Sequence, residues 1–123
     1  MRKDKEKNLN KRIEKYKGVG YKLKINQEII QETNRVWGFE YMTALCMEEF
    51  AEVVQAINKV RRNNNYDNLN HLDEEIADCL ICIEQLKDLG LVDEQRIQHW
   101  VDYKQARQII RNEAQYNKEG YKL

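Results

Sequence analysis

The amino-acid sequence predicts an all-α protein, and more specifically a helical bundle. Its 123 residues include no proline and only five glycines, the two residues that helix interiors tolerate least. Apolar residues recur at helical spacing in several segments, each bounded by capping or turn residues. Charged residues make up 34% of the chain and its mean hydropathy is −0.88, so one chain buries a thin core. We therefore expect oligomerisation, as a homodimer or homotetramer, to complete the core.

The predicted organisation is a charged extension at 1–24, a helical domain at 25–115 and a tail at 116–123. Asn26 is the expected N-cap of the first helix, and Gly38 is expected to break or kink it. The second predicted helix covers 39–62, and its apolar stripe consists of Met42, Cys46, Phe50, Val53, Ile57 and Val60.

A turn at 63–67 precedes the third predicted helix, for which Asp67 is the expected cap. That helix covers 68–89 and stops at Gly90, and Asp93 is expected to cap a fourth helix. The apolar stripe of the third helix consists of Leu72, Ile76, Cys79, Leu80, Ile83 and Leu86. Four helices with short connections are typical of a bundle.

Composition and charge argue against several classes of protein. The formal net charge is zero, whereas nonspecific nucleic-acid binders are usually basic, so no nucleic-acid partner is expected. The three cysteines, Cys46, Cys79 and Cys82, are an odd number, which favours reduced thiols in a cytoplasmic protein. No apolar run approaches the ~18 residues of a membrane span, and the first residues lack the apolar region of a secretory signal. We expect a cytoplasmic protein without a membrane partner.

Two acidic motifs carry the candidate chemistry. The second predicted helix contains Glu48, Glu49 and Glu52, and the third contains Glu75 and Asp78. Glu49 and Glu52 are three residues apart, as are Glu75 and Asp78, so each pair shares one helix face. Both pairs lie one residue to the side of the apolar stripe, at the edge of the buried face. A carboxylate in that position is costly unless it is paired or bound to a metal.

The short turn between the two helices predicts that they lie antiparallel and adjacent. At ~1.5 Å rise per residue, the two acidic pairs then lie at similar distances from the turn, and four carboxylates converge. Hard oxygen ligands favour Mg²⁺, or Mn²⁺, over zinc. A di-iron carboxylate bundle is disfavoured because it needs a histidine three residues after a glutamate, where this chain has Glu52 and Asp78.

The pattern Glu-Glu-x-x-Glu, followed after 22 residues by Glu-x-x-Asp, resembles the signature of the all-α NTP pyrophosphohydrolase superfamily. That group includes MazG, dimeric dUTPases, dCTP pyrophosphatases and phosphoribosyl-ATP pyrophosphohydrolases. The wider segment from Asn68 to Leu86 is similar to small MazG-like proteins of Gram-positive bacteria and their phages. The resemblance covers roughly residues 35–112.

The resemblance implies an Mg²⁺-dependent enzyme that converts a nucleoside triphosphate to a monophosphate and pyrophosphate. Metal ions bridging the triphosphate and activating a water molecule would account for this chemistry. The general base would be Glu48 or Glu49, and the sequence does not decide between them. The implied metal ligands are Glu49, Glu52, Glu75 and Asp78.

Other residues are candidates for substrate contacts. Lys104, Arg107 and Arg111 share one face of the fourth predicted helix and would clamp the triphosphate; a solvated basic row is an equally good interpretation. Trp37 precedes the first acidic motif and would stack on a base, although aromatics at such junctions more often pack in a core. Cys79 and Cys82 are expected to be core residues. The alternative function is that of a noncatalytic helical interaction protein that retains the fold.

Overall fold

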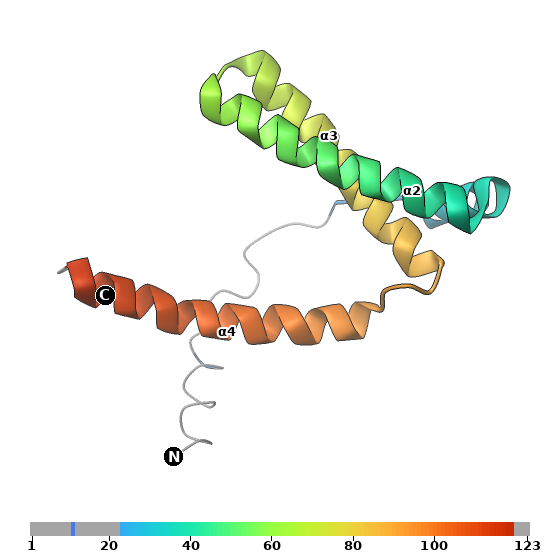
Figure 1. The fold of residues 1–123 in the computed structure, drawn as a ribbon. Coiled ribbons are helices and arrows are strands. Elements are labelled where there is room, and N and C mark those ends of the chain that lie inside the picture. Colours follow the sequence, from blue (N-terminus) through green and yellow to red (C-terminus); the bar gives the residue numbers. More distant parts are fainter. Residues whose placement is uncertain (1–10, 12–22, 120–123) are drawn as a thin grey trace. The chain divides into compact units, whose positions relative to one another are not determined.

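The computed structural model describes residue 11 and residues 23–119, and in this part of the chain every regular element is a helix (Figure 1). The helices are α2 (Gln27–Arg62), α3 (Tyr66–Asp88) and α4 (Glu94–Glu119). The predicted all-α class is thereby confirmed. Most of the predicted extension at 1–24 lies outside the described residues. No helix in the described residues is long and apolar enough to cross a membrane.

Helix α2 contains the predicted break. Gly38 has φ 83° and ψ 168°, so two helical segments meet there. A positive φ is readily adopted only by glycine, and no atom lies within 4 Å of the position that a Cβ would occupy. Backbone conformation alone therefore explains this glycine. The predicted cap is also confirmed, because the Asn26 side chain accepts a hydrogen bond of 3.0 Å from the Ile29 amide.

Helix α3 begins two residues earlier than expected, and the prediction of Asp67 as its cap was wrong. Asn65 is the N-cap, and its side chain accepts a hydrogen bond of 2.9 Å from the Asn68 amide. Asp67 instead lies in the first turn, where a negative charge interacts favourably with the helix dipole. At the other end, Gly90 has φ 77°. The Gly90 amide donates a hydrogen bond to the carbonyl of Lys87, and the Leu91 amide donates one to the carbonyl of Leu86. These two hydrogen bonds form a Schellman cap.

Helices α2 and α3 form an antiparallel pair joined by residues 63–65, and they lie side by side in Figure 1. They belong to one compact unit, Lys24–Asp93. The buried apolar core of the described chain is small and consists of Ile30, Met42, Cys46, Ala56 and Cys82. It includes three sulfur-containing side chains, which adapt to irregular space between helices.

The buried faces depart in part from the predicted apolar stripes: Met42 and Cys46 of the α2 stripe are buried as expected, but the buried face is shifted near Ala56 and along α3. On α2, Ala56 is buried, whereas Ile57 is 44% exposed. On α3, Glu75 and Cys82 are buried, whereas Ile76 is 40% exposed. The rotation moves the carboxylates from the edge of the interface into it and leaves large apolar side chains on the surface. This packing places the acidic residues of the candidate site in the interface between α2 and α3.

Helix α4 belongs to a different compact unit from the α2–α3 pair. It continues through Glu119, four residues past the predicted end of the domain at 115. Nearly all of its side chains are exposed, including Trp100, Tyr103 and Ile110, each more than half exposed. The predicted domain boundaries themselves stay a prediction.

Candidate metal centre

Both predicted acidic motifs lie in the interface between α2 and α3. Glu49 and Glu52 follow the Gly38 break on α2, and Glu75 and Asp78 lie on the antiparallel α3. One carboxylate oxygen from each of Glu49, Glu52 and Glu75 lies within 4.8 Å of the other two. Asp78 is not one of these three converging groups, although its charge acts on Glu49 and helps to raise the pKa of that carboxyl group. The structure therefore brings three of the four predicted ligands together across the antiparallel pair, and the role of all four as ligands stays a prediction.

Burial makes this cluster unusual. Glu75 is only 6% exposed and Glu49 is half-buried. Glu49 Oε2 and Glu75 Oε2 are buried and have no hydrogen-bond partner among the described residues. A buried polar atom without a partner destabilises a fold by roughly 1–3 kcal/mol, and more if it is charged. Two such atoms in one acidic cluster would be stabilised by a nearby positive charge.

Burial and mutual repulsion also raise the pKa values of Glu49 and Glu75. The pKa of Glu49 rises from 4.5 to about 7, chiefly because burial disfavours the carboxylate, and further because Asp78, Glu52 and Glu75 repel it. The pKa of Glu75 is also raised, first by burial and then by its hydrogen bond to Glu52. Metal-free protein thus holds protons where a cation would otherwise supply the positive charge.

The donor set fits a hard divalent cation. The three converging groups all offer carboxylate oxygen, which Mg²⁺ and Mn²⁺ prefer. The unpartnered oxygens of Glu49 and Glu75 are available as ligands without breaking any hydrogen bond in which they take part. We therefore find the residues suited to holding such an ion.

The three cysteines lie on α2 and α3, where Cys46 and Cys82 are buried and Cys79 is half-buried. All three are free thiols. Cys46 Sγ donates to the carbonyl of Cys82, and Cys79 Sγ donates to the carbonyl of Glu49, each at 3.8 Å. Burial raises the pKa of both Cys79 and Cys82, which keeps these thiols protonated and disfavours metal binding by sulfur. The core role expected for the Cys79-x-x-Cys82 pair agrees with this environment.

Other predicted site residues lie in varied surroundings. Glu48 is exposed beside Glu49 on α2. Trp37 is 57% exposed rather than packed in a core, and its ring stacks on that of Tyr41 with centroids 4.9 Å apart. The basic residues Lys104, Arg107 and Arg111 are exposed on α4. Their assignment to a substrate, like that of Trp37, stays a prediction.

Sequence reasoning missed two residues of the α2–α3 pair. His71 Nε2 lies 3.7 Å from Glu75 Oε1, and its spacing of four residues from Glu75 was the available signal. Asn34 is 6% exposed, and its Nδ2 donates to the carbonyl of Gln85 at 3.0 Å and to Asp88 Oδ2 at 2.9 Å. Nothing in the local sequence marks Asn34, because its contacts are more than fifty residues away.

An all-α protein with a carboxylate centre between two antiparallel helices is the class that this geometry defines. The model of the MazG nucleotide pyrophosphohydrolase domain matches residues 38–96. The matched segment begins at the Gly38 break and includes all four predicted ligands. It identifies the chain as MazG-like and confirms the resemblance that the two acidic motifs indicated. No curated protein and no solved structure matches the chain.

The match supports, at the level of the class, a hydrolase that acts on nucleotides.

Proposed function

We propose that the protein is an Mg²⁺-dependent nucleoside triphosphate pyrophosphohydrolase that produces a (d)NMP and pyrophosphate from a (d)NTP. The observation that carries this proposal is the convergence of Glu49, Glu52 and Glu75, because Glu49 and Glu75 each have a buried oxygen without a hydrogen-bond partner among the described residues. An ordinary structural helix pair gains nothing from such an arrangement, since it destabilises the fold. The cluster lies within the segment that matches the family of nucleotide pyrophosphohydrolases.

Glu49, Glu52, Glu75 and Asp78 would hold Mg²⁺, with Mn²⁺ as the alternative. When bound, the ion supplies positive charge to the triphosphate oxygens and lowers the pKa of the attacking water. The reaction adds water across the bond between the α- and β-phosphates. The carboxylates of α2 and α3 orient the triphosphate, and the half-buried interface limits how far they can move.

Glu48 and Glu49 are the two candidates for the general base. Glu49 has a pKa of about 7 in the metal-free protein, which is near the value at which a base is most effective at neutral pH. Glu48 is exposed and is free to accept a proton from water without giving up a ligand. Separate substitutions of the two residues, with pH–rate profiles, distinguish these roles.

Substrate contacts complete the proposal. The exposed Trp37 ring, already stacked on Tyr41, offers a flat surface for a nucleobase. Lys104, Arg107 and Arg111 would bind the phosphates. Selection of base and sugar depends on these contacts rather than on the carboxylates.

Association of identical chains is part of the same proposal. Many large apolar side chains of the α2–α3 pair are exposed, including Met47 at 74% and Val54 at 68%. Burying them against a second copy would contribute about 25 cal/mol per Å² of apolar surface. We expect a cytoplasmic homodimer or homotetramer, and light scattering that shows a stable monomer at micromolar concentration would contradict this.

A substrate panel tests the activity. Canonical and damaged NTPs and dNTPs are incubated with Mg²⁺, and both monophosphate and pyrophosphate are measured. We expect equal amounts of the two products from at least one nucleotide, and none in EDTA. Mg²⁺ binding without turnover of any nucleotide would instead favour the noncatalytic interaction protein.

A further inference from the structure

Charge is strongly segregated along this chain, although its formal net charge is zero. Residues 24–93 contain 6 Lys and Arg but 14 Asp and Glu, whereas residues 1–23 and 94–123 together contain 15 and 7. The division falls at the boundaries of the compact unit Lys24–Asp93. The zero net charge is therefore the sum of an acidic part and a basic part. It no longer argues against a nucleic-acid partner for the basic part.

Helix α4 arranges its basic residues on one face. Lys104, Arg107, Arg111 and Lys118 follow Trp100 at intervals of four, three, four and seven residues, and all are exposed. At about 100° per residue, these five side chains fall within an arc of roughly 60°. Asp102 and Glu113 fall on the opposite side of the helix by the same geometry. One face of α4 is thus free of acidic residues.

Aromatic rings accompany the basic face. Trp100 is 56% exposed and Tyr103 is 54% exposed. Their ring centroids lie 6.0 Å apart in an edge-to-face arrangement, and the guanidinium carbon of Arg107 lies 5.7 Å from the Tyr103 centroid. Three planar groups therefore follow one another along a basic surface. Exposed rings beside cations are the combination by which proteins hold unpaired bases and their phosphates.

We propose that this face of α4 binds single-stranded nucleic acid, an activity beyond nucleotide hydrolysis that shares Lys104, Arg107 and Arg111 with the triphosphate contacts proposed above. The basic side chains contact successive phosphates, and the rings of Trp100 and Tyr103 stack on bases. A duplex does not offer its bases for stacking, and an anionic membrane offers charge without bases. Single strands therefore fit both features of the face. The nine Lys and Arg in residues 1–23 add long-range attraction for a polyanion.

The test uses the full chain in EDTA, so that hydrolysis plays no part. Fluorescence anisotropy measures binding of a labelled oligonucleotide of about 15 nucleotides, of a duplex of the same length, and of anionic vesicles. We expect saturable binding of the single strand that weakens as salt rises. Free nucleoside triphosphate at the same phosphate concentration competes poorly, because it occupies only part of the face.

Paired variants separate stacking from charge. Trp100→Ala/Tyr103→Ala is expected to weaken single-strand binding roughly tenfold or more while leaving its salt dependence and any triphosphate hydrolysis unchanged. Arg107→Gln/Arg111→Gln is expected to lower the slope of log K against log salt by about 1.4, at ~0.7 per charge lost. Tyr66→Ala is the aromatic control, because Tyr66 is 78% exposed on α3. Arg61→Gln/Arg62→Gln is the matched charge control, and both controls should bind as the parent does.

Several results would overturn the proposal. These are no binding at low salt, equal affinity for the duplex, preference for vesicles, or unchanged binding by the Trp100→Ala/Tyr103→Ala protein. Circular dichroism confirms that each variant retains its helices, and Arg107→Lys/Arg111→Lys should keep the salt slope. If no nucleotide in the substrate panel is hydrolysed but the single strand still binds, the enzyme assignment is rejected and the proposal for α4 stands.

Discussion

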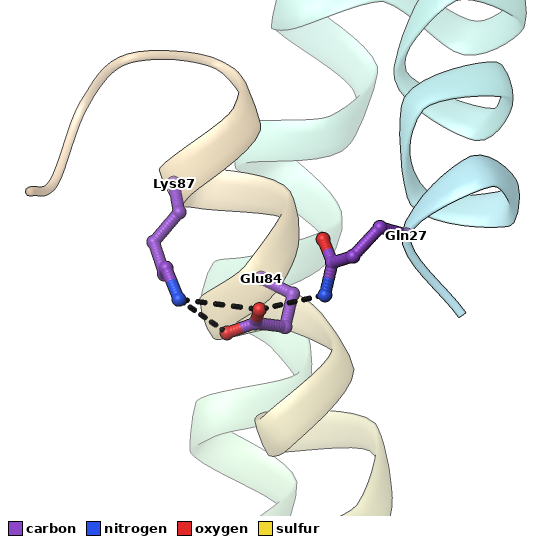
Figure 2. A network of polar contacts seen from close by, with 3 residues as sticks. All are labelled: Gln27, Glu84 and Lys87. Atoms are coloured by element: carbon purple, nitrogen blue, oxygen red, sulfur yellow. Dashed lines mark hydrogen bonds and ion pairs between the residues drawn. The ribbon is translucent and has the colours of Figure 1, made fainter. Parts of the chain in front are cut away.

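Two glutamates of α3, Glu75 and Glu84, lie in contrasting electrostatic surroundings within the same helix pair. The Glu84 carboxylate is fully paired: Oε1 accepts from Gln27 Nε2 at 2.9 Å, and Lys87 Nζ lies 3.2 Å from Oε1 and 3.0 Å from Oε2 (Figure 2). The Glu75 carboxylate is more deeply buried, faces other carboxylates, and leaves Oε2 without a partner among the described residues. His71 Nε2 lies 3.7 Å from Glu75 Oε1.

The difference separates structural polar contacts from a binding site. Around Glu84, a local lysine and a glutamine from the start of α2 satisfy the charge, so the network ties that end of α2 to α3 (Figure 2). Around Glu75, no lysine or arginine of the described residues forms an ion pair with the carboxylate. Burial, together with repulsion from neighbouring carboxylates, raises the pKa values of Glu49 and Glu75. A fold retains an unfavourable cluster when a ligand compensates for it, which is the reason for assigning the metal to Glu75 and its neighbours.

The largest expected effect follows from removing charge at the unpaired cluster. Glu75→Gln is expected to reduce hydrolysis by about 100-fold or more, because metal ligation contributes several kcal/mol to the transition state. Its stability without metal should equal or exceed that of the parent, since the glutamine amide donates a hydrogen bond to Glu52 and one repulsive charge is gone. Steady-state kinetics and urea unfolding in EDTA measure both quantities.

Glu74→Gln is the matched control for that experiment. Glu74 is the neighbouring residue on α3, carries the same charge, and is exposed. Its substitution should leave both hydrolysis and stability near the parental values. Equal loss of activity in the two variants would mean that overall charge, rather than ligation by Glu75, controls turnover.

A second effect is stabilisation by the metal itself. An ion that binds only the folded state stabilises it by about 2.7 kcal/mol when its concentration is a hundred times Kd. For a domain of this size, Tm then rises by several degrees. Thermal melts with and without millimolar Mg²⁺ test this, and Glu75→Gln protein should show little response. An unchanged Tm in the parent would contradict a preformed metal centre.

The raised pKa of Glu49 predicts a pH dependence with a definite sign. Folding raises this pKa from 4.5 to about 7, so between these values the folded state binds more protons than the unfolded state. The contribution of Glu49 to the stability of the metal-free protein is therefore fully present below pH 4.5, and this contribution is lost as pH rises through about 7. Urea unfolding in EDTA at pH 5, 6, 7 and 8 should show the decline, and saturating Mg²⁺ should flatten it. A stability that rose with pH over this range would exclude the cause given for the shift.

The sequence was sufficient to predict the helices and the convergence of three carboxylates, because both depend on local spacing. Capping at Asn26 and the break at Gly38 follow from the preferences of single residues. The three-residue spacing of the acidic pairs, with a short turn between the helices, was enough to predict that Glu49, Glu52 and Glu75 lie close together. These features need no knowledge of distant contacts.

The rotation of the buried faces was not predictable in the same way. Periodicity favoured a stripe through Ile76 and Ile57, whereas the helices pack through Glu75 and Ala56. Hydrophobic pattern identifies an apolar face but does not identify what that face packs against, so pattern alone does not distinguish an exposed apolar face from a core. The contacts of Asn34 and Gln27 to the end of α3 are tertiary and leave no local pattern.

The smallest expected effect is that of a substitution at Glu84, the glutamate whose carboxylate is paired. Glu84→Gln removes the charge that attracts Lys87, but its side-chain oxygen can still accept a hydrogen bond from Gln27. Both members of the ion pair keep some solvent exposure, 26% for Lys87 and 18% for Glu84. An interaction of this kind, three residues apart on one helix, contributes about 0.3–1 kcal/mol. We therefore expect a small loss of stability in urea, hydrolysis within about twofold of the parent by the same reasoning, and a normal Tm response to Mg²⁺. A severe loss of turnover in Glu84→Gln protein would place Glu84 in the metal centre and would remove the contrast between the two glutamates.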